Sequence, residues 1–351
     1  MGRRPRVDRR AFLGASAGAL VCTIGGERVV LDSPGDAAKA DAAARRVARP
    51  AGVREPRGPF SVPEPAPGGR RVEYWIQART RTWDVVPTGR DDWHDVPVRG
   101  RRTFRAFVYQ SMSAGFAEPD GLATIPGPTL RCRVGDLLVV HFRNADERLG
   151  QAVTMHPHGV RYNPEYDGTF LGAYTRAGGF VAPGEEFTYL WEATPDAVGV
   201  WPYHDHGPNH TLNTFRGLFG ALVVYARDAK LPDVEETLFL HSFTPPVTGL
   251  RPQLQAINGR AYAGNTPEIR ARVGQDVAIH VMGMNNDFHD FHIHGHRWRD
   301  PSGAFVDTPT VGPNETITAR FVEDNPGRWL YHCHVFSHQD AGMAGWYVVQ
   351  P

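Results

Sequence analysis

The sequence predicts an all-β protein that consists of two β-sandwich domains. Short runs of β-prone residues alternate with turns from residue 72 onward, and no long segment repeats its apolar residues with the period of a helix. The second half of the chain also repeats the first. The chain has 38 Gly and 29 Pro among 351 residues, which suits many strands joined by tight turns. The number of strands and the turn residues favour sandwiches over barrels.

Charge and cysteine content exclude several functional classes. Lys plus Arg and Asp plus Glu balance at 38 each, so no net field attracts nucleic acid or an anionic membrane surface. Three cysteines, Cys22, Cys132 and Cys333, do not form a pattern of disulfide pairs. The 16 histidines are more informative, because most of them lie in tight clusters in the second half of the chain.

The N-terminal residues 1–31 have the features of an export signal. Several arginines, including Arg9 and Arg10, precede a short apolar run over 11–24 that is too short to span a membrane. The paired arginines resemble a twin-arginine signal, whose translocase exports folded proteins, and an ordinary secretory signal is the alternative. We therefore expect a secreted or extracytoplasmic protein.

Residues 32–71 are rich in Ala, Arg, Pro and Gly. Such a composition buries too little apolar surface to offset the entropy of ordering the chain. We expect this segment to be a disordered tether.

The internal repeat defines two domains, residues 72–228 and 232–351. Within the first domain, the clearest strand-like runs are 102–109, 137–142, 187–191 and 218–224. Four segments recur in the same order along the chain, and such an ordered series is hard to obtain by chance. The matched segments are 130–135 with 269–274, 156–159 with 292–295, 183–185 with 313–315, and 199–206 with 327–334.

The densest set of metal-binding side chains surrounds the third cysteine. In an extended strand, successive side chains point to opposite faces, so Cys333 faces one side while His332 and His334 face the other. Cys333 with His338 and Met343 supplies much of a blue copper site, in which a thiolate stands beside imidazole and a weak axial thioether. The two flanking histidines face a separate space, where each could bind another metal ion.

Both predicted domains contain two His-x-His pairs. In a strand, the two imidazoles of a pair lie on one face, roughly 6–7 Å apart at the backbone, so a pair can straddle two metal ions. A three-metal cluster needs about eight such ligands. The pairs comprise His156, His158, His204, His206, His292, His294, His332 and His334. By the same alternation, His289 lies opposite His292, on the side of Cys333, and completes the mononuclear set.

The first domain cannot form a blue copper site, because other residues stand at three of the four positions that align with the ligands of the second domain. The aligned replacements are Asp205 for Cys333, Val153 for His289 and Phe215 for Met343. His210 alone remains, at the position that corresponds to His338. We interpret His210 as a relic or a local hydrogen-bonding group.

The complete series is His-x-His twice, then His-x-x-His-x-His, then His-Cys-His followed by His and Met. It resembles the four copper-binding segments of multicopper oxidases. With two domains and the blue site in the second, the chain is similar to the two-domain small laccases of actinobacteria. The resemblance covers roughly residues 100–351, and every ligand position is occupied. It implies that each domain is a cupredoxin-like Greek-key β-sandwich.

The resemblance also implies cofactors, partners and activity. About four copper ions per chain are expected, as one type 1 site, one type 2 site and a type 3 pair. The expected reaction is one-electron oxidation of phenols or aromatic amines, coupled to reduction of dioxygen to water. A homotrimer is expected, in which domain 1 of one chain meets domain 2 of its neighbour.

Three further residues match positions near the cluster of small laccases: Tyr162, Asp167 and Asp307. We expect the aspartates to take part in proton delivery and the tyrosine to lie beside the cluster. A turn position is the alternative interpretation of both aspartates.

Other classes of copper protein remain as alternatives. The second copper of a nitrite reductase needs only three histidines, and an electron-transfer cupredoxin would leave the four pairs unused. A cuprous-ion or other metal oxidase of copper tolerance is harder to exclude, although the methionine-rich segment typical of such enzymes is absent from this sequence.

Overall fold

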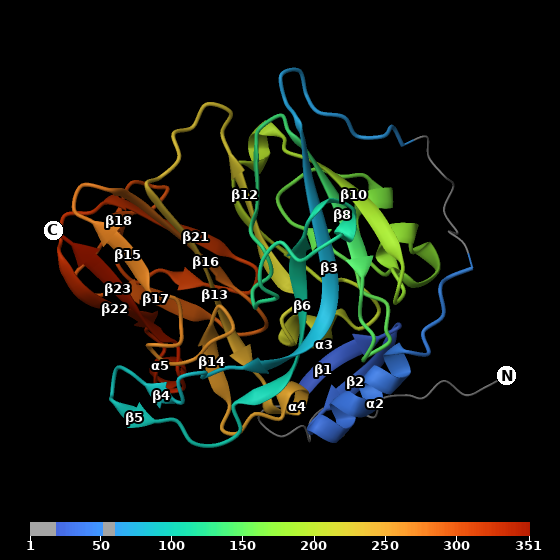
Figure 1. Ribbon diagram of the computed structural model, residues 1–351, viewed down its shortest axis with the longest axis horizontal. Coiled ribbons are helices and arrows are strands. Elements are labelled where there is room, and N and C mark those ends of the chain that lie inside the picture. Colours follow the sequence, from blue (N-terminus) through green and yellow to red (C-terminus); the bar gives the residue numbers. More distant parts are fainter. Residues whose placement is uncertain (1–18, 52–59) are drawn as a thin grey trace.

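The computed structural model describes residues 19–51 and 60–351, which form two β-sandwiches side by side (Figure 1). Each sandwich contains two main sheets, and each of these sheets has one parallel pair of strands among its antiparallel pairs. The predicted all-β fold of two β-sandwich domains is confirmed. The four strand-like runs named above lie in four of its strands, β6, β8, β10 and β12.

Domain 1 contains two four-stranded sheets. The first has the order β10-β8-β3-β6, and the second has the order β7-β12-β11-β9. The strands are β3 (Arg71–Asp84), β6 (Thr103–Met112), β7 (Leu130–Arg133), β8 (Leu137–Asn144), β9 (His156–Pro157), β10 (Glu186–Glu192), β11 (Gly199–His204) and β12 (Phe219–Tyr225). A short hairpin of β4 (Arg90–Asp91) and β5 (Val96–Pro97) projects from this domain.

Domain 2 repeats this topology. Its sheets have the orders β14-β13-β16-β21 and β15-β23-β22-β17-β20, which match the sheets of domain 1 strand by strand except for the added β20. The strands are β13 (Val234–Phe243), β14 (Leu254–Ile257), β15 (Ile269–Arg272), β16 (Asp276–Gly283), β17 (His289–Ile293), β20 (Thr310–Val311), β21 (Thr316–Val322), β22 (Gly327–Cys333) and β23 (Ala344–Gln350). A separate hairpin pairs β18 (Trp298–Arg299) with β19 (Phe305–Val306).

A buried tyrosine anchors the metal-binding strand in each domain. Tyr203 on β11 donates to the carbonyl of Pro128 at 2.6 Å, and Tyr331 on β22 donates to that of Pro267 at 2.6 Å. Both rings are completely buried. Because each hydroxyl has a backbone partner, these tyrosines add apolar packing without an unsatisfied polar group. The strands that carry the His pairs are therefore fixed in the same way twice.

The two domains share a hydrophobic core. Trp83 and Phe219 from domain 1 pack in one buried cluster with Phe239 and Phe243 from domain 2. The indole of Trp83 donates to the carbonyl of Gly259 at 2.6 Å. Burial of several aromatic rings across the boundary stabilises one relative orientation of the domains.

The prediction of a disordered tether from residue 32 is wrong for the helix α2 (Pro34–Ala44). Ser33 caps this helix by accepting from the amide of Asp36, and alanines at 37, 40 and 44 bury one face. The prediction from composition failed for two reasons. Alanine favours helix, and the apolar residues that cover this helix lie elsewhere in the chain.

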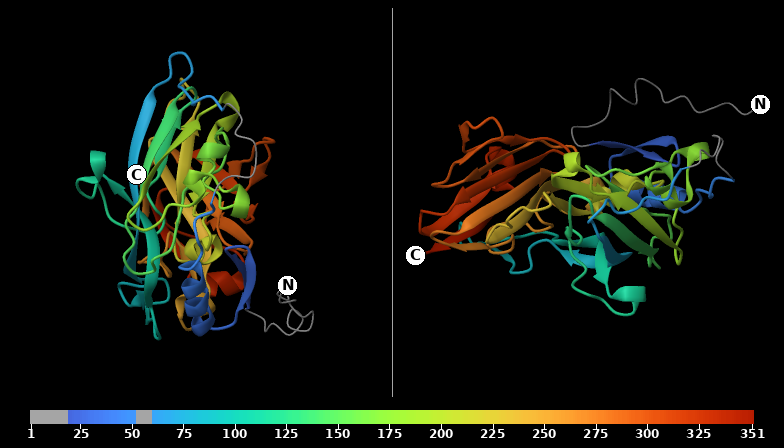
Figure 2. Two further views of the ribbon diagram at one scale, coloured as in Figure 1. Left: turned by 90° about the vertical axis from the view of Figure 1, so that its right-hand side faces the viewer. Right: turned by 90° about the horizontal axis from the view of Figure 1, so that it is seen from above.

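The β1–β2 hairpin (Leu20–Ile24 and Glu27–Leu31) supplies some of these burial partners. It packs with α2 against Leu212 and Phe215 of domain 1 and Val247 of domain 2, away from the C terminus (Figures 1 and 2). The predicted export signal overlaps this hairpin. Its residues 1–18, with the paired arginines, lie outside the described residues, so the signal stays a prediction.

Short helices connect the strands. The α-helices are α3 (His210–Phe215), α4 (Pro245–Thr248) and α5 (Phe336–Asp340), and the 3-10 turns are Ala114–Phe116, Pro164–Tyr166, Gly172–Tyr174, Ala177–Gly179 and Pro195–Ala197. In the part of the chain that the structure describes, no helix has the length and apolar character needed to cross a membrane.

Candidate metal centres

The first candidate metal centre lies beside the C-terminal end of β22 in domain 2. Cys333 Sγ lies 3.9 Å from Nδ1 of His289 and 3.8 Å from Nδ1 of His338. These three ligand atoms all lie within 4.8 Å of one another. Met343 is completely buried in the same hydrophobic cluster as Cys333. The structure thus brings together the three nitrogen and sulfur donors expected on the cysteine side of the strand.

The second group lies on the opposite face of the same strand. β22 pairs with β17 so that His332 stands opposite His292. The Nε2 atoms of His294 and His332 lie 3.2 Å apart, and the rings of His292 and His334 have centroids 5.7 Å apart. Strand alternation therefore separates Cys333 from its two neighbours, as the sequence predicts.

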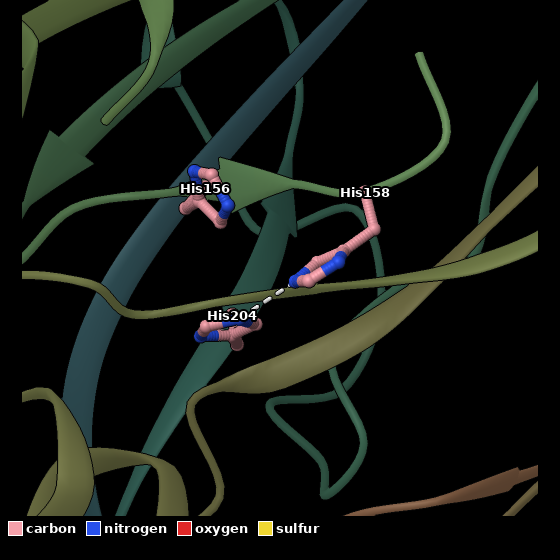
Figure 3. Close-up of side chains that lie close together, drawn as sticks. All are labelled: His156, His158 and His204. Atoms are coloured by element: carbon pink, nitrogen blue, oxygen red, sulfur yellow. Dashed lines mark hydrogen bonds between the residues drawn. The ribbon is translucent and has the colours of Figure 1, made fainter. Parts of the chain in front are cut away.

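Domain 1 contains the matching group of four histidines. His156, His158 and His204 form a potential metal-binding group, and the Nε2 atoms of His158 and His204 approach to 3.0 Å (Figure 3). His206 joins it, with its ring centroid 5.1 Å from that of His156. The antiparallel pairing of β9 with β11 brings these histidines together.

Backbone carbonyls orient one histidine of each group. Nδ1 of His156 donates to the carbonyl of Asp167 at 2.6 Å, and Nδ1 of His292 donates to that of Asp307 at 2.9 Å. A neutral imidazole that donates from Nδ1 keeps the lone pair of Nε2 free for a metal. Gly168 permits the first contact, since a Cβ at this position would lie 2.0 Å from the carbonyl oxygen of Met155.

The strand that carries each group orients a second histidine in the same way. Nδ1 of His204 donates to the carbonyl of Asp205 at 2.8 Å, and Nδ1 of His332 donates to that of Cys333 at 2.9 Å. In both domains this hydrogen bond leaves Nε2 of the histidine, His204 or His332, free to bind a metal.

Burial favours the neutral form of several of the predicted ligand histidines. It lowers the pKa of His158, His206, His289 and His332 to about 4 each, with further lowering by neighbouring histidines. Desolvation disfavours the charged imidazolium, and a neutral ring retains a lone pair at neutral pH.

The two four-histidine groups remain apart within one chain. Among the described residues, no hydrogen bond or ring contact joins a cluster histidine of domain 1 to one of domain 2. His294 and His334 are exposed on the surface of domain 2. Each group therefore provides four of the eight predicted cluster ligands.

The structure places the three predicted neighbours beside these groups. The ring of Tyr162 lies 5.8 Å from that of His156, and burial, then the nearby Asp167 carboxylate, raise the pKa of this tyrosine to about 12. The Asp167 carboxylate itself lies 3.3 Å from Nδ1 of His156. Asp307 reaches His292 through its backbone carbonyl, and its side chain is exposed.

Two histidines outside the predicted ligand set have defined partners. His210 stacks on His206 with ring centroids 4.6 Å apart, and its Nδ1 lies 3.3 Å from the carbonyl of Gly207. His296 is buried, and its Nε2 lies 3.1 Å from the carboxylate of Glu323. Glu323 also accepts from Tyr347, so this cluster forms a buried structural network.

Sequence reasoning missed three residues beside the histidines. The hydroxyls of Thr169 and Thr308 lie 3.3 and 3.2 Å from Nδ1 of His156 and His292, respectively. Each threonine lies within two residues of the predicted aspartate of its domain, Asp167 or Asp307, and this proximity is a signal that the sequence contains. Trp93, from the β4–β5 hairpin of domain 1, lies with its ring centroid 6.4 Å from that of His332, which no local pattern indicates.

The donor sets fit copper. One thiolate with two imidazoles on one face, and imidazoles alone on the other, are the ligands that copper prefers in blue and in all-nitrogen sites. Nδ1 of His206, in the group with His156, is a buried polar atom without a hydrogen-bond partner among the described residues. Such atoms are rare in proteins unless a ligand or a catalytic role accounts for them.

Comparison with known proteins supports this chemistry. Two multicopper oxidase family models match residues 123–229 and 231–351, which together form most of the chain. A probable nitrite reductase-hydroxylamine oxidoreductase fusion protein of Kuenenia stuttgartiensis is 31% identical over 258 residues, covering 67% of this chain and 29% of its own length. The ferroxidase HEPHL1 of Homo sapiens is 28% identical over 297 residues, covering 71% and 25%. The chain thus spans under a third of the length of these relatives.

Solved structures share the fold, and they confirm the predicted cupredoxin-like class of the two domains. A multicopper oxidase crystal structure superimposes with a TM-score of 0.64 and 24% identity, over 82% of this chain and 92% of that one. A copper nitrite reductase from Nitrosomonas europaea gives a TM-score of 0.58 and 19% identity, over 80% and 94%. Taken with the family matches and the duplicated histidine groups, these comparisons establish that the chain belongs to the multicopper oxidase family.

Proposed function

We propose that the protein is a laccase-like oxidase, which couples one-electron oxidation of phenols or aromatic amines to the four-electron reduction of dioxygen to water. The observation that carries this proposal is that one strand serves two sites. Cys333 belongs to the group with His289 and His338, while its neighbour His332 belongs to the group with His292 and His294. Peptide bonds on both sides of Cys333 therefore join the two sites.

Bound copper would supply the redox chemistry, which is single-electron transfer at a type 1 site and dioxygen reduction at a type 2 site with a type 3 pair. His289, Cys333, His338 and Met343 would hold the type 1 ion. The eight paired histidines would hold the other three, about four ions per chain in total.

The residues around the sites fit distinct tasks. Cys333, His289 and Met343 are completely buried, whereas His338 is partly exposed, so a reducing substrate approaches the type 1 site at His338. Asp167 borders a cavity of about 290 Å³, and Asp307 borders one of about 630 Å³. Each carboxylate is thus placed to pass protons between solvent and a cluster histidine, and Asp167 lies closer.

A homotrimer would complete the cluster. Each chain offers two half-sites that do not touch, and the exposed rings of His294 and His334 need a partner. Domain 1 of one chain and domain 2 of its neighbour would supply eight histidines together. Export by the twin-arginine route is part of the same proposal, because that route carries proteins that have already folded.

Copper content and oxygen uptake test the activity. We expect about four copper ions per chain, and oxygen consumption with phenols and aromatic amines. A panel that includes nitrite, Cu(I) and Fe(II) separates the alternatives. About two copper ions with nitrite reduction would instead indicate a nitrite reductase, and about one would indicate an electron carrier.

A metal-ion oxidase is the second candidate, because ferroxidases are among the relatives. Oxygen uptake that is fast with Fe(II) or Cu(I) and negligible with phenols would favour it over the laccase.

Complementation between variants tests the shared cluster. We expect His158→Ala and His334→Ala each to inactivate the protein alone. Co-expression should restore activity, because an interface between the intact domain 1 of one chain and the intact domain 2 of the other retains all eight histidines. No recovery in a mixed trimer would place the cluster within one chain.

A further inference from the structure

In domain 1 a buried polar network occupies the position that the type 1 group has in domain 2. Asp205 aligns with Cys333 and is completely buried. One oxygen of its carboxylate accepts from the amides of Thr154 at 2.8 Å and Gly207 at 3.1 Å, and the other accepts from the Asn213 side chain at 2.9 Å. With the Thr154 hydroxyl at 3.4 Å, the carboxylate therefore has four hydrogen-bond donors, all within the fold.

This network ends at a cluster histidine. The hydroxyl of Thr154 accepts from the amide of His206 at 3.1 Å and lies 3.4 Å from Asp205. In domain 2 the equivalent amide, that of His334, donates instead to the backbone carbonyl of Asp290 at 2.6 Å. Domain 1 thus fixes its His206 through a side chain.

The carbonyl of Asp205 accepts from Nδ1 of His204 at 2.8 Å. The residue that replaces the thiolate therefore contacts one cluster histidine directly and the next one through Thr154. Its position between His204 and His206 makes it the centre of the strand end that carries both rings.

The other end of the network leads to the N-terminal helix α2. Asn213 accepts from Gln151 at 3.1 Å, and Gln151 accepts from Asn209 at 2.8 Å. Asn209 lies 3.3 Å from Asp41 on α2, and Asp41 accepts two hydrogen bonds from Arg216, at 2.7 and 2.8 Å.

Burial makes each link in this network matter. The side chains of Thr154, Asn209, Asn213 and Asp205 are fully buried, and those of Gln151, Asp41 and Arg216 are nearly so. A buried donor that loses its acceptor has no water to replace it, so the backbone or the ring must move to find another partner.

We propose that this network, from Asp41 to Thr154, positions the domain 1 half of the copper cluster in place of a metal ion. The Asp205 network holds the strand end at His204 and His206, as a bound ion would in domain 2. The inference rests on the proposed trinuclear cluster. It also means that α2, through Asp41, helps to hold the cluster histidines of domain 1 in place.

Two pairs of variants test the network. Thr154→Val removes the acceptor of the His206 amide with almost no change in shape, and Thr154→Ser retains the hydroxyl. In Asp205→Asn, the new side-chain amide faces the side-chain amide of Asn213, so two donors meet without an acceptor. The double variant Asp205→Asn with Asn213→Asp reverses both partners and restores every hydrogen bond and the total charge.

Copper content, the blue absorption of the type 1 site and the reoxidation rate are measured in each purified holoprotein. Thr154→Val and Asp205→Asn should weaken copper binding at the cluster by more than about tenfold, with the blue absorption retained. Thr154→Ser and the double variant should remain close to wild type. Asp276→Asn, which breaks an exposed ion pair with Arg320, serves as the control.

The outcomes separate the inference from the proposed function. A wild-type protein with only about one copper ion per chain refutes the proposed cluster. A wild type with a full cluster, and with Thr154→Val and Asp205→Asn equal to it, overturns the positioning role. A double variant that binds copper no more tightly than Asp205→Asn also overturns this role. A Thr154→Val chain that fails to fold while Thr154→Ser folds does so as well, since either result indicates a general structural role.

Discussion

The Nε2 atoms of His158 and His204 lie 3.0 Å apart, although the two residues are 46 positions apart in the sequence. Their counterparts in domain 2, His294 and His332, lie 3.2 Å apart across 38 positions. In both domains one ring follows the short strand and the other lies on its antiparallel neighbour. The same pairing of strands thus brings two imidazole nitrogens close together in each domain.

Loss of one of these nitrogens should affect only the cluster. We expect His158→Ala to lower copper at the cluster by more than about tenfold, because a ligand is lost, and to leave the blue absorption of the Cys333 site intact. Metal analysis with visible spectroscopy checks this. His141→Gln is a matched control, since His141 is a partly buried histidine outside the cluster. A parallel loss of blue colour would contradict the separation of the two sites.

Cys333→Ser should give the reverse pattern. Serine is a harder ligand than thiolate and does not support a blue copper site. We expect the blue absorption to disappear and substrate oxidation to fall by more than roughly 100-fold, with copper retained at the paired histidines. Steady-state oxygen uptake and copper content together measure the result. A variant that stays blue would mean that Cys333 is not the thiolate ligand.

Asp167→Asn and Asp307→Asn should differ in their effects. Both variants keep the backbone carbonyls that orient His156 and His292, so copper content should not change. The Asp167 carboxylate lies 3.3 Å from His156, while the side chain of Asp307 is exposed. Removing a general acid or base costs roughly 100-fold or more, so we expect slower reoxidation in both variants and the larger effect at Asp167. Stopped-flow reoxidation at wild-type rates would exclude a proton-transfer role.

The buried ion pair between Asp41 and Arg216 should make α2 essential for stability. Asp41→Asn leaves a buried guanidinium without its charge partner, which costs about 3–5 kcal/mol of unfolding free energy. The exposed pair that Asp276 forms with Arg320 should contribute about 1 kcal/mol or less. Thermal unfolding of Asp41→Asn beside Asp276→Asn gives the comparison. Equal melting temperatures would show that α2 adds nothing to domain 1.

His241 should make the folded state sensitive to acid. It is completely buried, its Nε2 accepts from the amide of Gly259 at 3.0 Å, and burial lowers its pKa from 6.5 to about 3. As the pH falls below 6.5 the unfolded chain binds a proton here and the folded chain does not. Stability is therefore complete above pH 6.5 and decreases toward pH 3, by about 1.4 kcal/mol per pH unit from this group.

The variant His241→Phe removes this titration. It should be less stable at pH 7, because the Gly259 amide loses its acceptor, and its stability should depend less on pH between 6.5 and 4. Denaturant unfolding across this range gives both slopes. Identical slopes for the two proteins would assign the acid sensitivity to other groups.

The sequence by itself determined the all-β class, the duplicated domains and the two faces of the metal-binding strand. Alternation along a strand is a local property, so the opposite directions of Cys333 and His332 follow from their adjacency alone. The repeat adds which positions are shared, and hence that Asp205 replaces Cys333.

Only the tertiary structure decided how these residues are supported. The approach of Trp93 to His332 and the link from Asp41 to Asp205 join segments that are distant in the sequence, and the carbonyls that orient His156 and His292 come from loops beyond the strands. Such contacts depend on the packing of whole strands and on burial, which no local pattern encodes. For the same reason, composition alone could not reveal that an alanine-rich segment before domain 1 folds as a helix upon it.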